Sequence, residues 1–292
     1  MNVEPINQNQ KNLAIGVFDS GMGGLTVLKE LKKSLPNESL IYLGDTARLP
    51  YGTKSLKTVR QYALQMARIL IEQDIKLLVI ACNTATTAAL DYLRQQFPNL
   101  SIIGVVEPGA ATAVNTTRCN KVAVLATETT IRSNIYELEM QKLNADLTTI
   151  NLACGLFVAL AEEGCVDDAI AIAAIEKYLA PLKQSEIDCL VLGCTHFPVL
   201  KQAIQNYLGN GVEIVDSAEA TARAVAIYLE KNNLMAVRRE FIRFFVTDQP
   251  ERFIRISSIF FSEEVDPKQV ELIEFTNETV TRLQQTSTVI KL

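Results

Sequence analysis

The most informative part of the sequence is a pair of similar stretches, LLVIACNT (residues 77–84) and CLVLGCTH (residues 189–196). Each is an apolar run that ends in a cysteine followed by polar residues, and the alignment of the two places Cys82 on Cys194. Short, nearly continuous apolar runs are typical of parallel strands that are covered on both faces. The two stretches therefore predict two equivalent buried strands, each followed directly by a cysteine.

A second pair of stretches repeats in the same order. VVEPGAATA (105–113) aligns with IVDSAEATA (214–222), at nearly the same offset as the two cysteines. A hydroxyl residue also follows an earlier apolar run in each half, Ser20 in the first and Thr127 in the second. Because two aligned blocks in one order rarely arise by chance, we interpret the chain as two copies of one α/β unit.

Apolar runs alternate with amphipathic segments along almost the whole chain. In residues 54–73, for example, apolar side chains recur every three or four positions from Leu56 to Leu70, which places them on one helical face. We predict an α/β fold with two similar three-layer domains, mostly parallel sheets, a pseudo-twofold relation and an active site in the cleft between the domains. The expected strands are 13–18, 40–43, 77–81, 102–106, 122–126, 147–152, 189–193, 212–215 and 242–246.

The repeat suggests where the domains begin and end. We predict a first domain of residues 13–105 plus 219–292 and a second domain of residues 106–218. The segment after the second copy is too short for a third domain. We expect it to contribute one more strand and two helices that pack back onto the first domain. The polar residues 1–12 lack the apolar core of a signal peptide, and we expect a flexible tail there.

The composition excludes several classes of protein. The 292 residues are 48% hydrophobic and 21% charged, a globular balance, and no apolar stretch approaches the ~18 residues that span a bilayer. The net charge of -5, without a Lys/Arg-rich run, gives no reason to expect a nucleic-acid partner. We expect a cytoplasmic protein with reduced cysteines. Six dispersed cysteines and a single histidine, His196, do not predict a metal site.

The positions of Cys82 and Cys194 indicate chemistry. Ligands collect at the carboxyl ends of strands in open α/β sheets, and a helix N-terminus lowers the pKa of a thiol. We therefore expect these two thiols to be reactive and interpret the other four as packing residues. Inversion of a carbon acid needs a base on one face and an acid on the other, and a thiol with a pKa of about 8.5 can serve as either. One thiol on each wall of a cleft predicts a racemase without a cofactor.

Polar residues beside the cysteines suit a small anionic substrate. Asn83 and Thr84 follow the first cysteine, and Thr195 and His196 follow the second. The Gly-rich stretch at 19–24 lets backbone N–H groups approach a carboxylate. A tight turn between a strand and a helix explains that stretch equally well.

Six segments, spread over nearly the whole chain after the tail, form a specific set. They are IGVFDSGMGGLTVL (15–28), YLGDTARLPYG (42–52), ACNTAT (81–86), GVVEPG (104–109), LVLGCTHFPVL (190–200) and IVDSAEATA (214–222). Together they resemble glutamate racemase, of the aspartate/glutamate racemase superfamily. The resemblance implies cofactor-independent interconversion of L- and D-glutamate, which supplies D-glutamate for peptidoglycan biosynthesis. It leaves both a monomer and a homodimer open.

The resemblance also implies roles for individual residues. Cys82 and Cys194 match the two catalytic bases of the family, and Asp19 and His196 match residues that assist them. The positions that match substrate-binding residues are Asp19, Ser20, Pro50, Tyr51, Gly52, Asn83, Thr84, Thr127, Thr130, Thr195 and His196.

Two segments depart from the family's pattern. CGLFVAL (154–160) lacks two prolines of that pattern. Just after it, Glu162 matches an assisting catalytic carboxylate, with the adjacent Glu163 as the alternative. Thr129 and Asn134 stand where glycines are usual. These changes leave both thiols and their neighbours in place.

Other functions fit parts of the pattern. A cysteine-dependent hydrolase would use one thiol with His196 as base, but it leaves Cys82 and the repeat unexplained. A non-catalytic amino-acid-binding protein explains the cleft but not the thiols. An aspartate racemase shares the chemistry, although GDTARLPYG and DSGMGG favour the glutamate branch. A pyridoxal phosphate racemase needs a Schiff-base lysine, and these motifs carry none.

Overall fold

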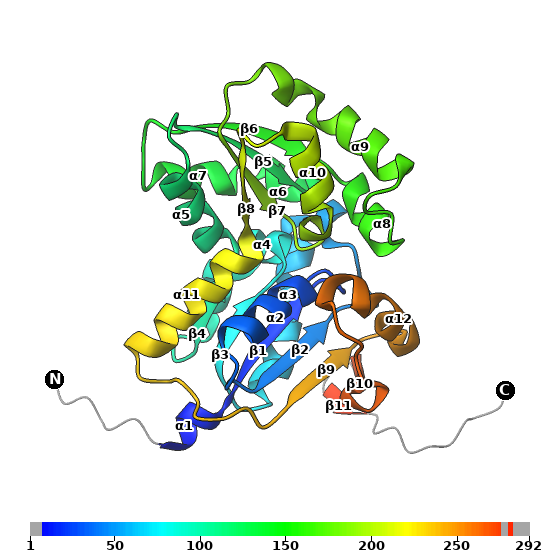
Figure 1. Cartoon of the computed structure of the whole chain (residues 1–292). Coiled ribbons are helices and arrows are strands. Elements are labelled where there is room, and N and C mark those ends of the chain that lie inside the picture. The colour runs from blue at the N-terminus through cyan, green and yellow to red at the C-terminus, as the bar shows by residue number, and fades with distance from the viewer. Residues whose placement is uncertain (1–7, 276–279, 283–292) are drawn as a thin grey trace.

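The strands form two separate sheets, which we describe for residues 8–275 and 280–282 of a computed structural model. The strands of the first sheet are β1 (Ala14–Asp19), β2 (Leu40–Gly44), β3 (Ile75–Ile80), β4 (Ser101–Gly104), β9 (Ile242–Val246), β10 (Val270–Phe275) and β11 (Val280–Arg282). Those of the second sheet are β5 (Lys121–Ala126), β6 (Thr148–Ala153), β7 (Cys189–Gly193) and β8 (Glu213–Asp216). Each sheet lies in its own lobe (Figure 1).

Both sheets contain the same arrangement of four strands. The first sheet has the order β11-β10-β9-β2-β1-β3-β4 and the second the order β6-β5-β7-β8. In chain order, both therefore carry the pattern second-first-third-fourth, as two copies of one unit require. All pairings are parallel except that of β10 with β11. The predicted fold class, two α/β domains with mostly parallel sheets, is confirmed.

Helices cover both faces of each sheet. In the lower lobe of Figure 1 they are α2 (Leu25–Ser34), α3 (Leu56–Ile71), α4 (Asn83–Gln96), α12 (Pro250–Phe261) and the short α1 (Gln8–Asn12). In the upper lobe they are α5 (Val106–Thr116), α6 (Glu128–Arg132), α7 (Ile135–Gln141), α8 (Leu156–Glu162), α9 (Ala169–Leu179) and α10 (Lys201–Leu208). The long α11 (Ser217–Lys231) begins at the upper lobe and runs down beside the lower one (Figure 1).

Short 3-10 helices lie between some of these strands and helices. They are η1 (Tyr51–Thr53), η2 (Ala180–Gln184), η3 (Phe197–Leu200) and η4 (Pro267–Gln269). Of these, η1 and η3 lie next to predicted site residues, because η1 begins at Tyr51 and η3 follows His196 directly.

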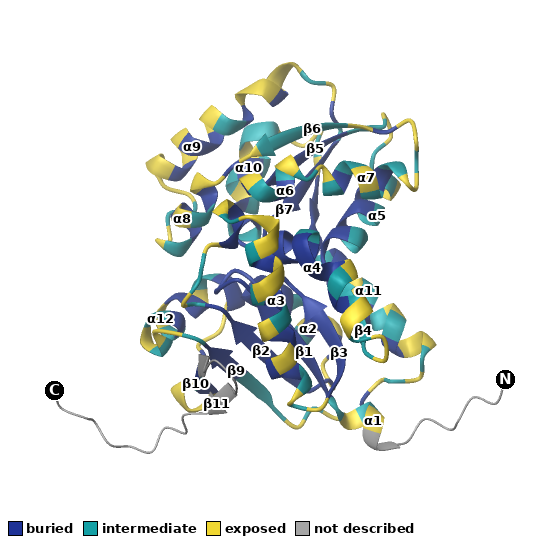
Figure 2. Cartoon of the chain, turned by 180° about the vertical axis from the view of Figure 1, so that it is seen from behind, coloured by how far each residue is buried: buried dark blue, intermediate teal, exposed yellow. Residues whose placement is uncertain are grey.

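The apolar strand residues alternate between two packing clusters in each lobe, because successive side chains of a strand point to opposite faces. In β1, Val17 packs with residues of α2, α11 and α12, whereas Phe18 packs with residues of α3 and α4. In β5, Val124 packs with α5 and α7, and Leu125 packs with α8, α9 and α10. Both lobes are therefore three-layered, and Figure 2 shows their central strands as buried.

The predicted helix at 54–73 forms as α3. Ser55 caps it by accepting a hydrogen bond from the backbone N–H of Thr58 at 3.2 Å. From Val59 to Leu70 the predicted apolar face is buried, but Leu56 is 41% exposed. The first turn of the helix therefore projects beyond the sheet that the rest of it covers.

Some details differ from the sequence predictions. The strand predicted at 102–106 ends at Gly104, and α5 begins at Val106. The strand predicted at 147–152 forms as β6 (Thr148–Ala153), whose residues are half-buried or exposed because β6 is an edge strand. The C-terminal segment contributes three strands where we expected one, since β10 and β11 extend the sheet beyond β9. The glutamates of VELIEF and the shortness of VTR break the continuous apolar run that marks the other strands.

The N-terminal residues were expected to form a tail up to residue 12. Residues 1–7 lie outside the described residues, and 8–12 form α1. A buried lysine holds this helix in place: Lys76 Nζ lies 2.5 Å from Glu38 Oε2 and donates hydrogen bonds to the carbonyl oxygens of Lys11 at 2.6 Å and Leu234 at 2.8 Å. Burial lowers the pKa of Lys76, and the Glu38 carboxylate opposes that shift.

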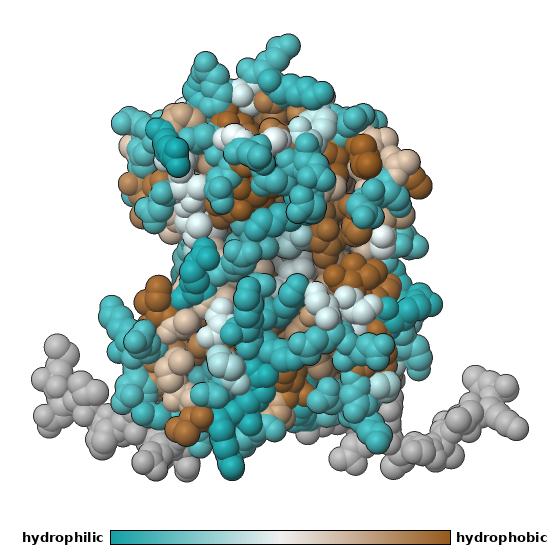
Figure 3. All heavy atoms as spheres, viewed as in Figure 1, coloured by the Kyte–Doolittle hydropathy of each residue, from teal (hydrophilic) through white to brown (hydrophobic). Residues whose placement is uncertain are grey.

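The described surface is mostly polar. Figure 3 shows a largely hydrophilic face with apolar patches near the waist where the lobes meet. Within residues 8–275 and 280–282, no helix combines the length and the apolar content that crossing a membrane requires.

Candidate active site

Both predicted reactive cysteines lie at the carboxyl ends of central strands. Cys82 follows β3 and is the N-cap of α4, where its Sγ accepts a hydrogen bond from the backbone N–H of Ala85 at 3.4 Å. Cys194 follows β7, but the helix after it is the 3-10 helix η3 rather than an α-helix. Pro198 lies in the first turn of η3, and α10 begins only at Lys201. Only Cys82 therefore caps an α-helix.

The two thiols are buried close to one another. Cys82 is 5% exposed and Cys194 is 6% exposed. They are near enough for a charge on Cys194 to raise the pKa of Cys82. Because one thiol belongs to each lobe, this buried space lies between the lobes, as the sequence predicted for the active site.

The environment of Cys82 favours the neutral thiol. Burial and the nearby Asp19 carboxylate raise the pKa of Cys82 to about 12. Hydrogen bonds from Ser20 and from the N–H of Ala85 oppose this shift without cancelling it. The sequence predicted a lowered pKa from the helix N-terminus. That prediction is wrong for Cys82, because desolvation outweighs the helix contribution.

A chain of polar contacts leads from Cys194 across the second lobe. Nδ1 of His196 lies 3.8 Å from Cys194 Sγ, and Nε2 lies 3.1 Å from Glu162 Oε1. Burial opposes a charge on His196, but its hydrogen bonds with Cys194 and Glu162 raise its pKa to about 10. The raised pKa favours the imidazolium form of His196, in which both ring nitrogens can donate.

The carboxylate behind His196 is Glu162, whereas the neighbouring Glu163 is exposed. Burial alone would raise the pKa of Glu162, but the hydrogen bond and charge of His196, together with Arg252, lower it. The other Glu162 oxygen, Oε2, lies 3.1 Å from the Arg252 guanidinium on α12. Glu162 therefore remains ionised between two cations.

Asp19 connects the two lobes at the base of the site. It ends β1 and is fully buried, and its Oδ1 accepts a hydrogen bond of 3.3 Å from the Thr195 hydroxyl. Burial raises the pKa of Asp19, while the charge of His196 and backbone N–H groups of the Gly-rich turn oppose that shift. The Asp19 carboxylate therefore borders both thiol environments.

The glycines of the turn at 21–24 permit this close approach. A Cβ atom on Gly23 would lie 2.5 Å from both His196 Nδ1 and Thr195 Oγ1, and one on Gly24 would lie 2.4 Å from Asp19 Cβ. The close approach of the two lobes therefore requires glycine at 23, beyond what a tight turn would need.

Three predicted substrate-binding hydroxyls form a buried cluster between the lobes. Thr84 Oγ1 lies 2.9 Å from Thr127 Oγ1 and 3.3 Å from Thr130 Oγ1, and the last two are 3.1 Å apart. Beside them, Asn83 Oδ1 accepts a hydrogen bond of 2.7 Å from the Tyr136 hydroxyl. The Asn83 Nδ2 group is buried without a hydrogen-bond partner. An unpaired buried donor is costly, so a ligand acceptor at this position would be favoured.

The other predicted binding residues lie around η1. Gly52 contacts Thr127, since a Cβ atom there would lie 2.6 Å from Thr127 Cβ. Tyr51 is buried with its hydroxyl hydrogen-bonded to Asp45. Pro50 is exposed, and the structure does not bring it into the buried cluster.

Four residues near the site are not among the predicted site residues. Arg252 and Tyr136 lie far from the motifs, and nothing in the sequence near them indicates their partners. Thr26 donates a hydrogen bond of 3.0 Å to the Thr195 carbonyl. Cys154, interpreted as a packing residue, follows β6. Burial raises the pKa of Cys154 to about 12, and a charge on the nearby Cys194 adds to that shift. Its position after a strand was a signal that the sequence analysis missed.

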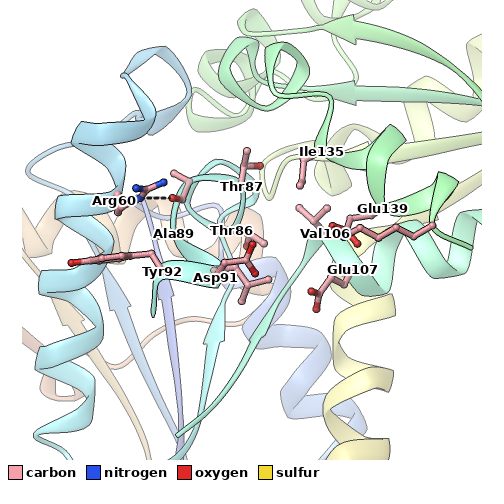
Figure 4. A pocket seen from close by; sticks show the side chains of 13 residues that line it. Arg60, Thr86, Thr87, Ala89, Asp91, Tyr92, Val106, Glu107, Ile135 and Glu139 are labelled. Carbon is pink, nitrogen blue, oxygen red and sulfur yellow. Dashed lines mark hydrogen bonds and ion pairs between the residues drawn. The ribbon is translucent and has the colours of Figure 1, made fainter. Parts of the chain in front are cut away.

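One surface cavity lies apart from the thiols. This cavity of about 130 Å³ is lined by residues of α4, α5 and α7, with Arg60 donating to the Ala88 carbonyl at 3.1 Å on its rim (Figure 4). None of the predicted site residues lines it. Within the described part of the chain, no three His, Cys, Asp or Glu side chains gather in a way that could hold a metal ion.

Fold and site together define a class of protein. It has two homologous α/β lobes, and each lobe brings one cysteine from the end of its third strand to a common buried site rich in hydroxyl and amide groups. Residues 15–225 match the family model described as Asp/Glu/Hydantoin racemase.

Individual relatives narrow this class. The chain is 48% identical to the glutamate racemase of Geobacter metallireducens, over 89% of this chain and 97% of that protein. Its structure is similar to that of a glutamate racemase isoform from Bacillus anthracis, with a TM-score of 0.86, 36% identity and coverage of 90% and 98% of the two chains. The glutamate racemase of Francisella tularensis, solved in complex with D-glutamate, gives a TM-score of 0.85 with 38% identity over 90% and 98%. The chain belongs to the Asp/Glu/Hydantoin racemase family and groups within it with the glutamate racemases.

Proposed function

We propose that this chain interconverts L- and D-glutamate by a two-thiol proton transfer at Cα. The observation that carries the proposal is the burial of Cys82 and Cys194 in one site, each from the equivalent position of its lobe. One thiolate removes the α-proton, and the thiol on the opposite face donates a proton to the resulting carbanion. Each turnover consumes one thiolate and one thiol and regenerates one of each.

The two thiols have different assisting groups in this mechanism. His196, as an imidazolium, donates toward Cys194 Sγ, with Glu162 behind it. Asp19 lies beside Cys82, which is held as a thiol by burial. By geometry either thiol could serve either enantiomer, and we adopt the assignment that the family resemblance implies, with Cys194 as the base for L-glutamate and Cys82 as the base for D-glutamate.

The polar cluster supplies the binding groups for the substrate. We assign the substrate carboxylates to the hydroxyls of Thr84, Thr127 and Thr130 and to the unpaired Asn83 Nδ2, with Ser20, Tyr51, Gly52 and Thr195 at the border. The complex of the Francisella tularensis relative with D-glutamate supports glutamate as the substrate. Because these residues are almost fully buried, the lobes must separate for glutamate to enter.

The physiological role follows from the product. D-Glutamate is a component of peptidoglycan, and we propose that the enzyme supplies it in the cytoplasm without a cofactor. We propose that the reaction takes place within one chain, in a monomer or in a homodimer. Aspartate racemisation is the alternative nearest in chemistry.

The first test is incubation of the full chain with L-glutamate in D2O without added cofactor. We expect loss of optical rotation together with deuterium at Cα, and much slower turnover of L-aspartate under the same conditions. Racemisation without deuterium incorporation would exclude proton transfer through exchangeable thiols. Faster turnover of aspartate than of glutamate would reassign the substrate.

A further inference from the structure

Helix α12 lies outside both copies of the repeated unit, yet two of its side chains contact the residues behind Cys194. The Arg252 guanidinium lies 3.1 Å from Glu162 Oε2. The Phe260 ring packs edge-to-face on the His196 ring, with 5.3 Å between the ring centroids. One helix thus reaches both members of the Glu162–His196 pair.

The two oxygens of Glu162 serve different partners. Oε1 lies 3.1 Å from His196 Nε2, and Oε2 lies 3.1 Å from Arg252. A carboxylate held at both oxygens cannot rotate away from the imidazole. Because the His196 ring is then fixed at Nε2 and covered by Phe260, its Nδ1 stays directed at Cys194 Sγ.

The Arg252–Glu162 ion pair also joins the two lobes. Glu162 ends α8 in the second lobe, and Arg252 lies on α12, which packs on the first sheet. The Glu162 side chain is 10% exposed and that of Arg252 is 32% exposed. Separation of the lobes to admit a ligand would pull the pair apart, and closure would re-form it.

We propose that Arg252 is a positioning residue, which holds Glu162 against His196 and so directs His196 onto Cys194 when the lobes close. The charged or titratable groups that face His196 are Cys194, Glu162 and Asp19. Of these three, Arg252 acts directly on Glu162 only. The expected effect of Arg252 on catalysis rests on the proposed function. Its expected effect on the reactivity of the Cys194 thiol does not rest on that function.

The test compares the reactivity of the two thiols within one molecule. Wild type, Arg252→Met, Arg252→Lys and a control, Arg255→Met, are treated with iodoacetamide at pH 7, and labelling of Cys194 and Cys82 is followed by peptide mass spectrometry. Arg255 lies one turn further along α12 and is exposed. Opening of the lobes exposes both thiols, so a change in opening alters both labelling rates alike. The ratio of the two rates is therefore unaffected by lobe opening.

We expect Arg252→Met to lower the Cys194/Cys82 ratio about tenfold, the effect of one unit in a thiol pKa on its thiolate fraction. Arg255→Met should leave the ratio unchanged, and Arg252→Lys should restore most of it. In a Glu162→Gln background, Arg252→Met should have no further effect, because its action passes through Glu162. An unchanged ratio in Arg252→Met, or an equal further loss in the Glu162→Gln background, would overturn the proposal.

Two measurements keep this test independent of folding and of the proposed function. The far-UV circular dichroism and melting curve of each variant show whether it is folded, and a ratio is compared only between folded variants. If Arg252→Met does not fold, Glu162→Gln alone must lower the ratio, and a normal ratio there overturns the proposal. Wild-type racemisation is assayed separately, so a chain inactive on glutamate can still show the effect on Cys194.

Discussion

The surroundings of Cys82 and of Cys194 differ although both cysteines end the third strand of their repeat. Cys82 caps an α-helix and lies beside Asp19, and the aligned position two residues later is Thr84. Cys194 precedes a 3-10 helix, and the residue two positions later is His196. One repeat therefore surrounds its thiol with an acid and hydroxyls, and the other with an imidazolium.

This difference shows how a duplicated fold can build an unsymmetrical site. The strand ends fix where both sulfur atoms lie, so their placement is nearly symmetric. The side chains that follow make the surroundings of the two thiols unlike, because a cation beside sulfur favours a thiolate and burial beside a carboxylate opposes it. Removal of a thiol tests the symmetric part of the site, and changes at His196 and Thr84 test the unsymmetrical part.

The largest effect is expected from removing either thiol. Cys82→Ser and Cys194→Ser should each lower racemisation by roughly 10²–10⁴-fold, the usual contribution of an acid–base group. In D2O, each variant should still exchange the α-proton of only one enantiomer, opposite for the two variants. Cys119→Ser, which alters an exposed cysteine, is the control and should retain activity. Undiminished racemisation in either active-site variant would contradict the mechanism.

The next effect concerns the charge of His196. Its pKa is raised in the folded state from 6.5 to about 10, so its contribution to stability is complete below about pH 6.5 and is lost as the pH rises toward 10. The free energy of unfolding of wild type relative to His196→Gln should therefore fall over this range, by roughly 2–5 kcal/mol. Urea titrations of both proteins at about pH 6, 8 and 10 measure this difference. A difference independent of pH would show that His196 is neutral in the fold.

The smallest effect is expected at Thr84, which occupies in the first repeat the position that His196 occupies in the second. Thr84→Val removes a hydroxyl from the buried cluster and should raise KM about fivefold with little change in kcat, since one hydrogen bond contributes about 1 kcal/mol. Thr129→Val is the matched control. Thr129 also makes contacts between the lobes, through hydrogen bonds to the Gly52 and Lys54 carbonyls, but it lies outside the cluster. Equal changes in KM for the two variants would mean that Thr84 acts only on lobe closure.

Much of the fold could be predicted from the sequence because its main signal is local. Buried parallel strands are apolar on both faces, and all nine predicted strands form, some with shifted ends. The strands β10 and β11 were missed because two glutamates interrupt the apolar residues of VELIEF and because VTR is short and carries one apolar residue. The end of β4 was misplaced because Val105 and Val106 suit a strand as well as a helix start.

The sequence predicted which residues form the site better than it predicted their contacts and pKa values. The two thiols, Asn83, Thr84 and Asp19 could be located because each lies within a few residues of a strand end. The exposure of Pro50 and the contact of Glu162 rather than Glu163 with His196 depend on how loops fold back, which no local pattern contains. The raised pKa of Cys82 depends on total burial, a property of the assembled lobes.

The sequence by itself determined the two α/β units, their repeat and the pair of cysteines, because strand periodicity and strand-end positions are properties of neighbouring residues. Only the tertiary structure decided which groups surround each thiol. Arg252 reaches Glu162 from a segment 90 residues further along the chain, and Thr84 meets Thr127 and Thr130 across the lobes. Those contacts exist because two lobes close on one another, and their energies depend on distance and burial rather than on order along the chain.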